Sequence, residues 1–123
     1  KIADTFPGLK LVVCHLLAPV RGREKEWRLS LELLNQENVW FDLAALPKIL
    51  EPDVYPYSET MGYLAQAKEI LGAEKLLWGT DAPFAATKDS YEHLCDYLEK
   101  GRVFTEEELQ KVYYDNSQKV FFS

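Results

Sequence analysis

Three short apolar segments constrain the fold of this chain more than any other feature. They are Leu9–Leu16, Asn38–Leu43 and Leu76–Gly79, and all are rich in aliphatic or aromatic residues. Near-continuous apolar runs of this length are typical of strands that are buried on both faces, as in a parallel sheet. Each run is followed by a segment with helical features, and strands that alternate with helices predict repeated βα units. Residues 1–123 are therefore predicted to form a single α/β unit.

The helices are predicted from periodicity and from capping residues. Between Glu24 and Asn35, the residues Trp27, Leu31 and Leu34 recur at helical spacing. A second helix is predicted over Glu59–Leu71, with Ser58 as N-cap and Gly72 after its end. A third is predicted from Asp89 or Ser90 to Lys100, with Gly101 closing it. Two more are predicted, one that begins with a capping box at Thr105–Glu108 and one over Asn116–Phe122. The segment from Leu43 to Tyr57 is predicted to be a loop rich in Pro and Tyr.

Composition and charge exclude several classes of function. The net charge is -6, and acidic and basic residues alternate along the chain, which argues against binding to nucleic acid or to an anionic membrane surface. The two cysteines, Cys14 and Cys95, form no C-x-x-C motif, so a reducing cytosol is expected. No segment is predicted to span a membrane or to act as a targeting signal. Residues 1–8 resemble the end of a helix, which suggests processing, proteolysis or a fragment.

Two polar residues are predicted at the carboxyl ends of strands. Alternation along the first strand places Leu11, Val13 and His15 on one face, with His15 last. Asp81 follows the third strand. In parallel α/β proteins this end of the sheet forms the mouth of the active site, where a carboxylate can bind a divalent ion and an imidazole can bind metal or transfer a proton. Each residue also has a structural reading, as a hydrogen-bonded loop histidine and as a turn cap.

Other residues are weaker candidates. Arg21 and Arg23 could pair with an anionic substrate, although a solvated loop explains them equally well. Tyr55 could line the mouth of the site, although packing within the loop is the better explanation. Asp42, inside the second strand, needs a partner and is expected to make a structural hydrogen bond to a neighbouring loop. Trp78 is expected to face the helices as part of the core.

Four segments in order carry a resemblance to a known family. They are Phe6–His15, Asn38–Leu43, Leu71–Pro83 and Tyr114–Phe121. Together they resemble the C-terminal half of the amidohydrolase-2 family, and the resemblance covers almost the whole chain. It implies the last part of a TIM-type (β/α)8 barrel, with the three predicted strands as strands six, seven and eight.

The resemblance also implies roles for the two candidates. Asp81 matches the aspartate after strand eight, which binds a divalent metal, typically zinc. His15 matches the histidine that ends strand six, which acts as an acid/base in relatives with one metal and is itself a ligand in relatives with two. The resemblance implies a small-molecule substrate, and it leaves a homodimer open as one mode of assembly.

Two departures from the family pattern limit what this part of the barrel does alone. Many relatives have glycines directly after the strand-six histidine, where this chain has Leu16, Leu17 and Ala18. The H-x-H pair of strand one and the histidine of strand five have no counterpart, because the resemblance begins after them. The other histidine, His93, is predicted to be exposed in a helix. The chain alone is therefore expected to be inactive, because a catalytic zinc site needs at least three protein ligands.

Two functions follow as hypotheses. The first is that the chain is part of a metal-dependent hydrolase or decarboxylase for a small, carboxylated or cyclic substrate, completed by the N-terminal half of the barrel. The alternative is a non-catalytic barrel module that acts in protein interaction. An unrelated α/β domain that binds phosphate has little support, because the chain has no Gly-rich phosphate loop.

Overall fold

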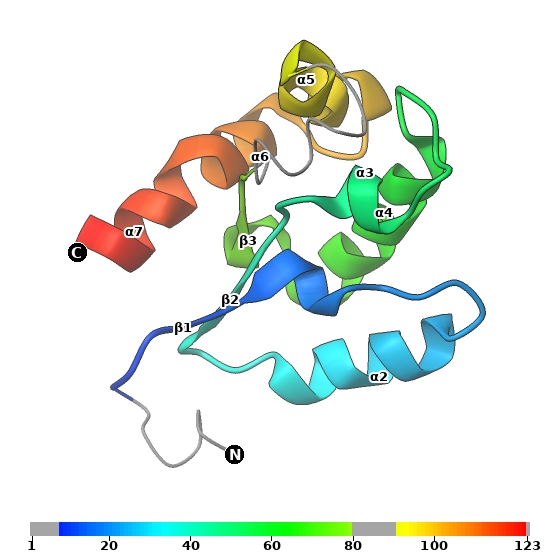
Figure 1. The fold of residues 1–123 in the computed structure, drawn as a ribbon. Coiled ribbons are helices and arrows are strands. Elements are labelled where there is room, and N and C mark those ends of the chain that lie inside the picture. The colour runs from blue at the N-terminus through cyan, green and yellow to red at the C-terminus, as the bar shows by residue number, and fades with distance from the viewer. Residues whose placement is uncertain (1–7, 80–90, 123) are drawn as a thin grey trace.

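In a computed structural model, which describes residues 8–79 and 91–122, three parallel strands form one sheet. Strand β2 (Val39–Asp42) is central and lies between β1 (Leu11–Val13) and β3 (Leu76–Leu77) (Figure 1). Leu11 pairs with Val39, and Phe41 pairs with Leu76. The predicted parallel sheet is confirmed, but each strand is shorter than its apolar run.

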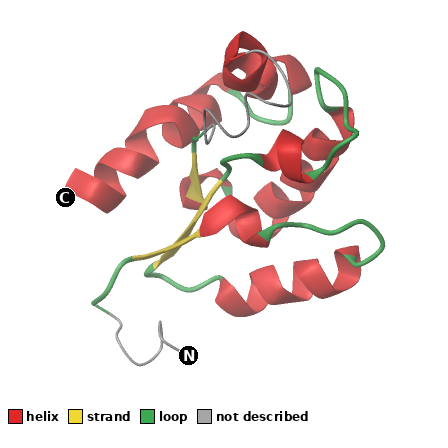
Figure 2. Cartoon of the chain, viewed as in Figure 1, coloured by secondary structure: helices red, strands yellow, loops and turns green. Residues whose placement is uncertain are grey.

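Helices surround the strands in the order that the sequence predicts (Figure 2). The elements are η1 (Cys14–Leu17), α2 (Glu24–Leu34), α3 (Leu46–Ile49), α4 (Ser58–Leu71), η2 (Ala73–Lys75), α5 (Tyr91–Gly101), α6 (Glu106–Gln110), the π-helical turn η4 (Lys111–Asp115) and α7 (Asn116–Phe122). None of the helices in these described ranges is long and apolar enough to cross a membrane. The short helix α3 was not predicted and replaces part of the expected loop.

The helix ends agree with the sequence at two places and differ at two others. The capping box at Thr105 and Glu108 is present, and Gly72 ends α4 with a positive φ of 83°. The prediction of Ser58 as N-cap was wrong, because Asp53 accepts the N–H of Glu59 (3.3 Å) and of Thr60 (2.7 Å) instead. Asp53 is buried, and its oxygens satisfy donors that the first helical turn leaves unpaired.

Helix α5 does not end as predicted. Gly101 is the last residue of the helix, one residue later than predicted, and the left-handed residue is Arg102, with a φ of 58°. Gly101 has a packing role, because a Cβ there would lie 2.4 Å from the terminal methyl carbon of Met61 in α4. The glycine therefore allows α5 to approach α4 closely.

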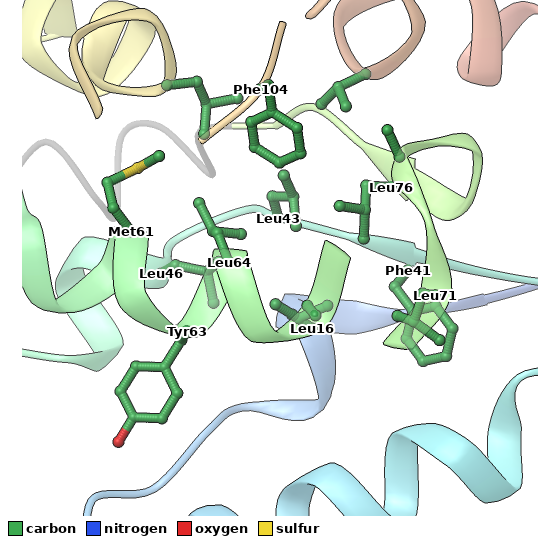
Figure 3. Close-up of a cluster of buried hydrophobic side chains, with 14 of the residues drawn as sticks. Leu16, Phe41, Leu43, Leu46, Met61, Tyr63, Leu64, Leu71, Leu76 and Phe104 are labelled. Carbon is green, nitrogen blue, oxygen red and sulfur yellow. The ribbon is translucent and has the colours of Figure 1, made fainter. Parts of the chain in front are cut away.

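The alternation along the strands divides the core into two faces. Phe41 of β2 and Leu76 of β3 pack into the main cluster with Leu64 and Leu71 of α4 (Figure 3). Val39 of β2 and residues of α2 belong to the same cluster. On the opposite face, Trp40 and Leu77 form a smaller cluster with Val120 of α7. Burial of one such leucine or phenylalanine contributes about 1.5–3 kcal/mol, so the main cluster supplies most of the stability of this fold.

Candidate functional site

His15 lies beyond the end of β1, not in it. The prediction that the strand reaches Leu16 was wrong, because β1 ends at Val13 and the chain enters η1. His15 has a φ of 54°, which breaks the strand alternation expected for its side chain. The histidine is nevertheless at the carboxyl end of the sheet, where the βα loops of parallel folds gather.

Two hydrogen bonds from the end of β2 hold His15. Its backbone N–H donates to Oδ1 of Asp42 (2.8 Å), and its ring Nδ1 lies 2.8 Å from the carbonyl oxygen of Ala44. Because a carbonyl can only accept, Nδ1 must carry the proton, which leaves Nε2 with a lone pair. The His15 side chain is 37% exposed. A partly exposed imidazole in this tautomer can bind a metal or accept a proton.

Asp42 holds this arrangement in place. Its Oδ1 also accepts the N–H of Ala44 at 3.2 Å. One carboxylate oxygen therefore joins the chain after β1 to the chain after β2. The structural hydrogen bond expected for Asp42 is confirmed. The role of Ala44 was missed, because a backbone carbonyl leaves no signal in the type of residue.

The segment that follows β3 lies close to Ala44, the residue that holds the His15 ring. A Cβ placed on Gly79, two residues beyond β3, would lie 3.2 Å from the Cβ of Ala44. Glycine thus allows the segment after β3 to pass close to the residue that holds the His15 ring. Asp81 follows two residues later and lies outside the described residues. Its role as a metal ligand stays a prediction.

The turn that carries His15 is left-handed. The four consecutive residues His15, Leu16, Leu17 and Ala18 have positive φ values of 54°, 50°, 60° and 46°. The left-handed region costs a residue with a Cβ about 1–2 kcal/mol. Burial of Leu16, which is fully inside the main cluster, and the bond from Trp27 Nε1 to the Leu16 carbonyl (2.9 Å) offset this cost.

Replacing Ala18 with glycine is expected to stabilise the protein. Ala18 is exposed and has a φ of 46°, so glycine removes strain without removing buried surface. We expect the free energy of unfolding to rise by about 0.5–1 kcal/mol in denaturant titrations. The matched control is Ala65→Gly, at an exposed position inside α4, which should lose about 1 kcal/mol. A loss of similar size at both positions would contradict the left-handed turn.

Both arginines predicted to bind substrate have protein partners. Arg21 donates to the carbonyl oxygens of Leu50 and Glu51 and pairs with Glu59, which ties the loop after η1 to the start of α4. Arg23 pairs with Glu26. Hydrogen bonds to these carboxylates raise the pKa of both guanidinium groups, so both stay charged. The geometry gives Arg21 a structural task, and substrate binding by either arginine stays a prediction.

Tyr55 lies in a contact between the loop before α4 and helix α5. Its hydroxyl donates to Oδ1 of Asp96 (2.8 Å), and its ring stacks on that of His93 with centroids 3.7 Å apart. The prediction that His93 is exposed was wrong, because the stacked ring of Tyr55 leaves it only partly accessible. The packing role that the sequence favours for Tyr55 has support, and its role in substrate binding stays a prediction.

The donor atoms in the described part of the chain match one position of a metal site. His15 donates its Nδ1–H to a backbone carbonyl, and metal-binding histidines are typically oriented in this way. Among residues 8–79 and 91–122, no three His, Cys, Asp or Glu side chains come close enough together to hold a metal ion. Within the described residues, His15 therefore fits the role of one metal ligand or of one proton-transfer group.

The chain matches the model of the family described as Amidohydrolase over residues 1–122. A search of curated proteins gave no match. Several solved structures are similar. An amidohydrolase from Burkholderia multivorans, solved with bound zinc, has a TM-score of 0.82 and 18% identity, over 97% of this chain and 46% of that one.

Two further structures carry more specific descriptions. A putative 2-pyrone-4,6-dicarboxylic acid hydrolase from Pseudomonas putida has a TM-score of 0.74 and 21% identity, over 98% of this chain and 46% of that one. A 2,6-dihydroxybenzoate decarboxylase from Rhizobium has a TM-score of 0.64 and 19% identity, over 98% of this chain and 36% of that one. The chain therefore spans less than half the length of these structures, and the likeness is one of fold.

Proposed function

This chain belongs to the amidohydrolase family, and we propose that it is the C-terminal part of a metal-dependent hydrolase or decarboxylase for a small, carboxylated or cyclic substrate. Strands β1, β2 and β3 would be strands six, seven and eight of a (β/α)8 barrel. An N-terminal portion of the protein would supply the other strands and the other metal ligands. The parallel order of the three strands supports this placement.

The observation that carries the proposal is the hydrogen bond between Nδ1 of His15 and the carbonyl oxygen of Ala44. This bond leaves Nε2 as the one ring nitrogen with a lone pair, at the carboxyl end of the sheet where Gly79 leads toward Asp81. The carboxylate of Asp81 would bind the cation, and His15 would bind it or move a proton to or from the substrate. A divalent ion would supply a Lewis acid at this position.

Similar structures were solved with two different metals. The Burkholderia protein was solved with zinc, and a dihydroxybenzoic acid decarboxylase from Polaromonas was solved with manganese. A site with an imidazole and carboxylates suits either ion. We propose zinc, because the resemblance of the motifs points to it, and metal analysis of the full-length protein decides between the two.

Replacing Asp81 with alanine in the full-length protein is expected to lower metal content and activity together. The reason is that loss of one of three or four ligands leaves the cation under-coordinated, and the expected fall in activity is about 100-fold or more. Metal is measured by elemental analysis, and activity with a pyrone dicarboxylate and a dihydroxybenzoate as probes. The matched control is Glu69→Ala, which removes a carboxylate at an exposed position in α4. Metal content and activity equal to those of the unmodified protein would refute the assignment.

The same assay separates the two roles of His15. If His15 is an acid/base, His15→Ala retains the metal and loses activity. If it is a ligand, His15→Ala loses both. His93→Ala is the matched control for metal content, because His93 lies in α5 and takes no part in the proposed metal site.

A further inference from the structure

The C-terminal helical run contains a π-helical turn beside the last strand. Helices α6 and α7 form one run from Glu106 to Phe122, which passes β3 (Figure 1) and is interrupted by η4. At the end of η4 the N–H of Asn116 donates to the carbonyl of Lys111, five residues earlier. In an α-helix that N–H would instead bond to Val112, four residues earlier.

The residue directly after β3, Trp78, bonds to this carbonyl of Val112. The oxygen of Val112 accepts the backbone N–H of Trp78 at 3.0 Å. The Trp78 ring lies against Tyr113 of the same turn, with centroids 5.1 Å apart, and also contacts the ring of Tyr97 in α5. The residue directly after β3 is thus held by its backbone and by its side chain.

The side chain of Asn116 holds the other end of the same segment. Its Nδ2 donates to the carbonyl oxygens of Ala73 and Leu76, both at 2.7 Å. Asn116 is buried, with 6% of its surface exposed, so water cannot easily replace it at these carbonyls. Val112 and Asn116 therefore fix residues 73–78 at both ends from one helical run.

We infer that Asn116, together with the π-helical turn η4, positions the carboxyl end of β3 for metal binding. The inference rests on the proposed function, in which Asp81 is a metal ligand. Asp81 follows Trp78 by three residues in the sequence, which span about 11 Å at most, so the position of Trp78 limits the positions that Asp81 can reach. Groups that orient metal ligands change affinity by about 10–100-fold when removed.

The test compares Asn116→Ala with Val120→Ala in the full-length protein. Val120 lies four residues later on the same helix and packs against Trp40 and Leu77, but its side chain makes no hydrogen bond to β3. Both variants remove buried atoms from α7. For each we would measure thermal stability and the dissociation constant for zinc by competition with a chelator. We expect Asn116→Ala to weaken zinc binding 10-fold or more. Val120→Ala loses packing against Leu77 but keeps both hydrogen bonds of Asn116, so we expect it to leave zinc binding within 2-fold.

The controls separate failure of this inference from failure of the proposed function. If Asp81→Ala binds zinc as tightly as the unmodified protein, the proposed function fails. If Asp81→Ala loses zinc while Asn116→Ala keeps the affinity of Val120→Ala, the positioning role alone is overturned. If Asn116→Ala does not fold, Asn116→Leu carries the comparison, because leucine fills a similar volume and cannot donate to either carbonyl. An unchanged zinc affinity in Asn116→Leu then overturns the inference, and a weakened one supports it.

Discussion

Replacing Asp42 with alanine is expected to lower the free energy of unfolding by about 2–4 kcal/mol, because a carboxylate that accepts two backbone N–H groups is lost. The carboxylate is 25% exposed and bonds His15 at 2.8 Å and Ala44 at 3.2 Å. Without it, nothing else in the described part of the chain is seen to hold the His15 N–H. The left-handed turn would lose a restraint that offsets its backbone strain.

The same substitution is expected to reduce activity of the full-length protein about 10–100-fold. The reason is that Asp42 holds Ala44, and the carbonyl of Ala44 in turn orients the ring of His15. Asp42→Asn is the matched variant. The amide keeps an oxygen that can accept both N–H groups, so it should lose less than half of the stability that alanine loses. Chemical denaturation measures the first effect, and steady-state kinetics the second. Equal losses for the two variants would show that the negative charge of Asp42, and not merely an oxygen that accepts the two N–H groups, is what it contributes.

The sequence predicts the sheet well because buried parallel strands are encoded by local composition. The runs that contain Val12, Phe41 and Leu76 are apolar on both faces, and all three strands were found in them. Similarly, the capping box at Thr105 and Glu108 depends on two residues three apart, so a local pattern is enough. Features of this kind need no knowledge of the rest of the fold.

The site is harder to predict because it depends on contacts between distant segments. The turn at His15 is left-handed although Leu16, Leu17 and Ala18 all disfavour that conformation. Their local preferences are outweighed by the burial of Leu16 and by Asp42, which bonds the N–H of His15 from 27 residues away in the chain. Similarly, Asp53 caps α4 although Ser58 stands in the expected position, because the loop folds back on the helix. Neither result leaves a pattern in the local sequence.

High pH is expected to unfold the protein through its buried tyrosines. Burial raises the pKa of Tyr97, and burial together with Glu99 and Asp96 raises that of Tyr113. Burial and the hydrogen bond to Glu24 raise the pKa of Tyr63 from 10.0 to about 12. A raised pKa means that the folded protein keeps protons that the unfolded chain releases. The stability from Tyr63 is therefore fully present below pH 10.0 and is lost as the pH rises through about 12, and Tyr97 and Tyr113 act in the same direction.

Tyr97 should dominate this loss, because its side chain is 2% exposed and its hydroxyl has no hydrogen-bond partner among residues 8–79 and 91–122. Above its ordinary pKa, each further pH unit favours unfolding by about 1.4 kcal/mol for such a group. Tyr97→Phe should shift the midpoint of alkaline unfolding to higher pH, with no loss of stability at neutral pH because no bond is removed. Tyr114→Phe, at a position that is 57% exposed, should leave the midpoint unchanged. The test follows tyrosinate absorbance and circular dichroism together. If Tyr97 ionises near pH 10 while the dichroism of the fold persists, its burial does not control alkaline stability.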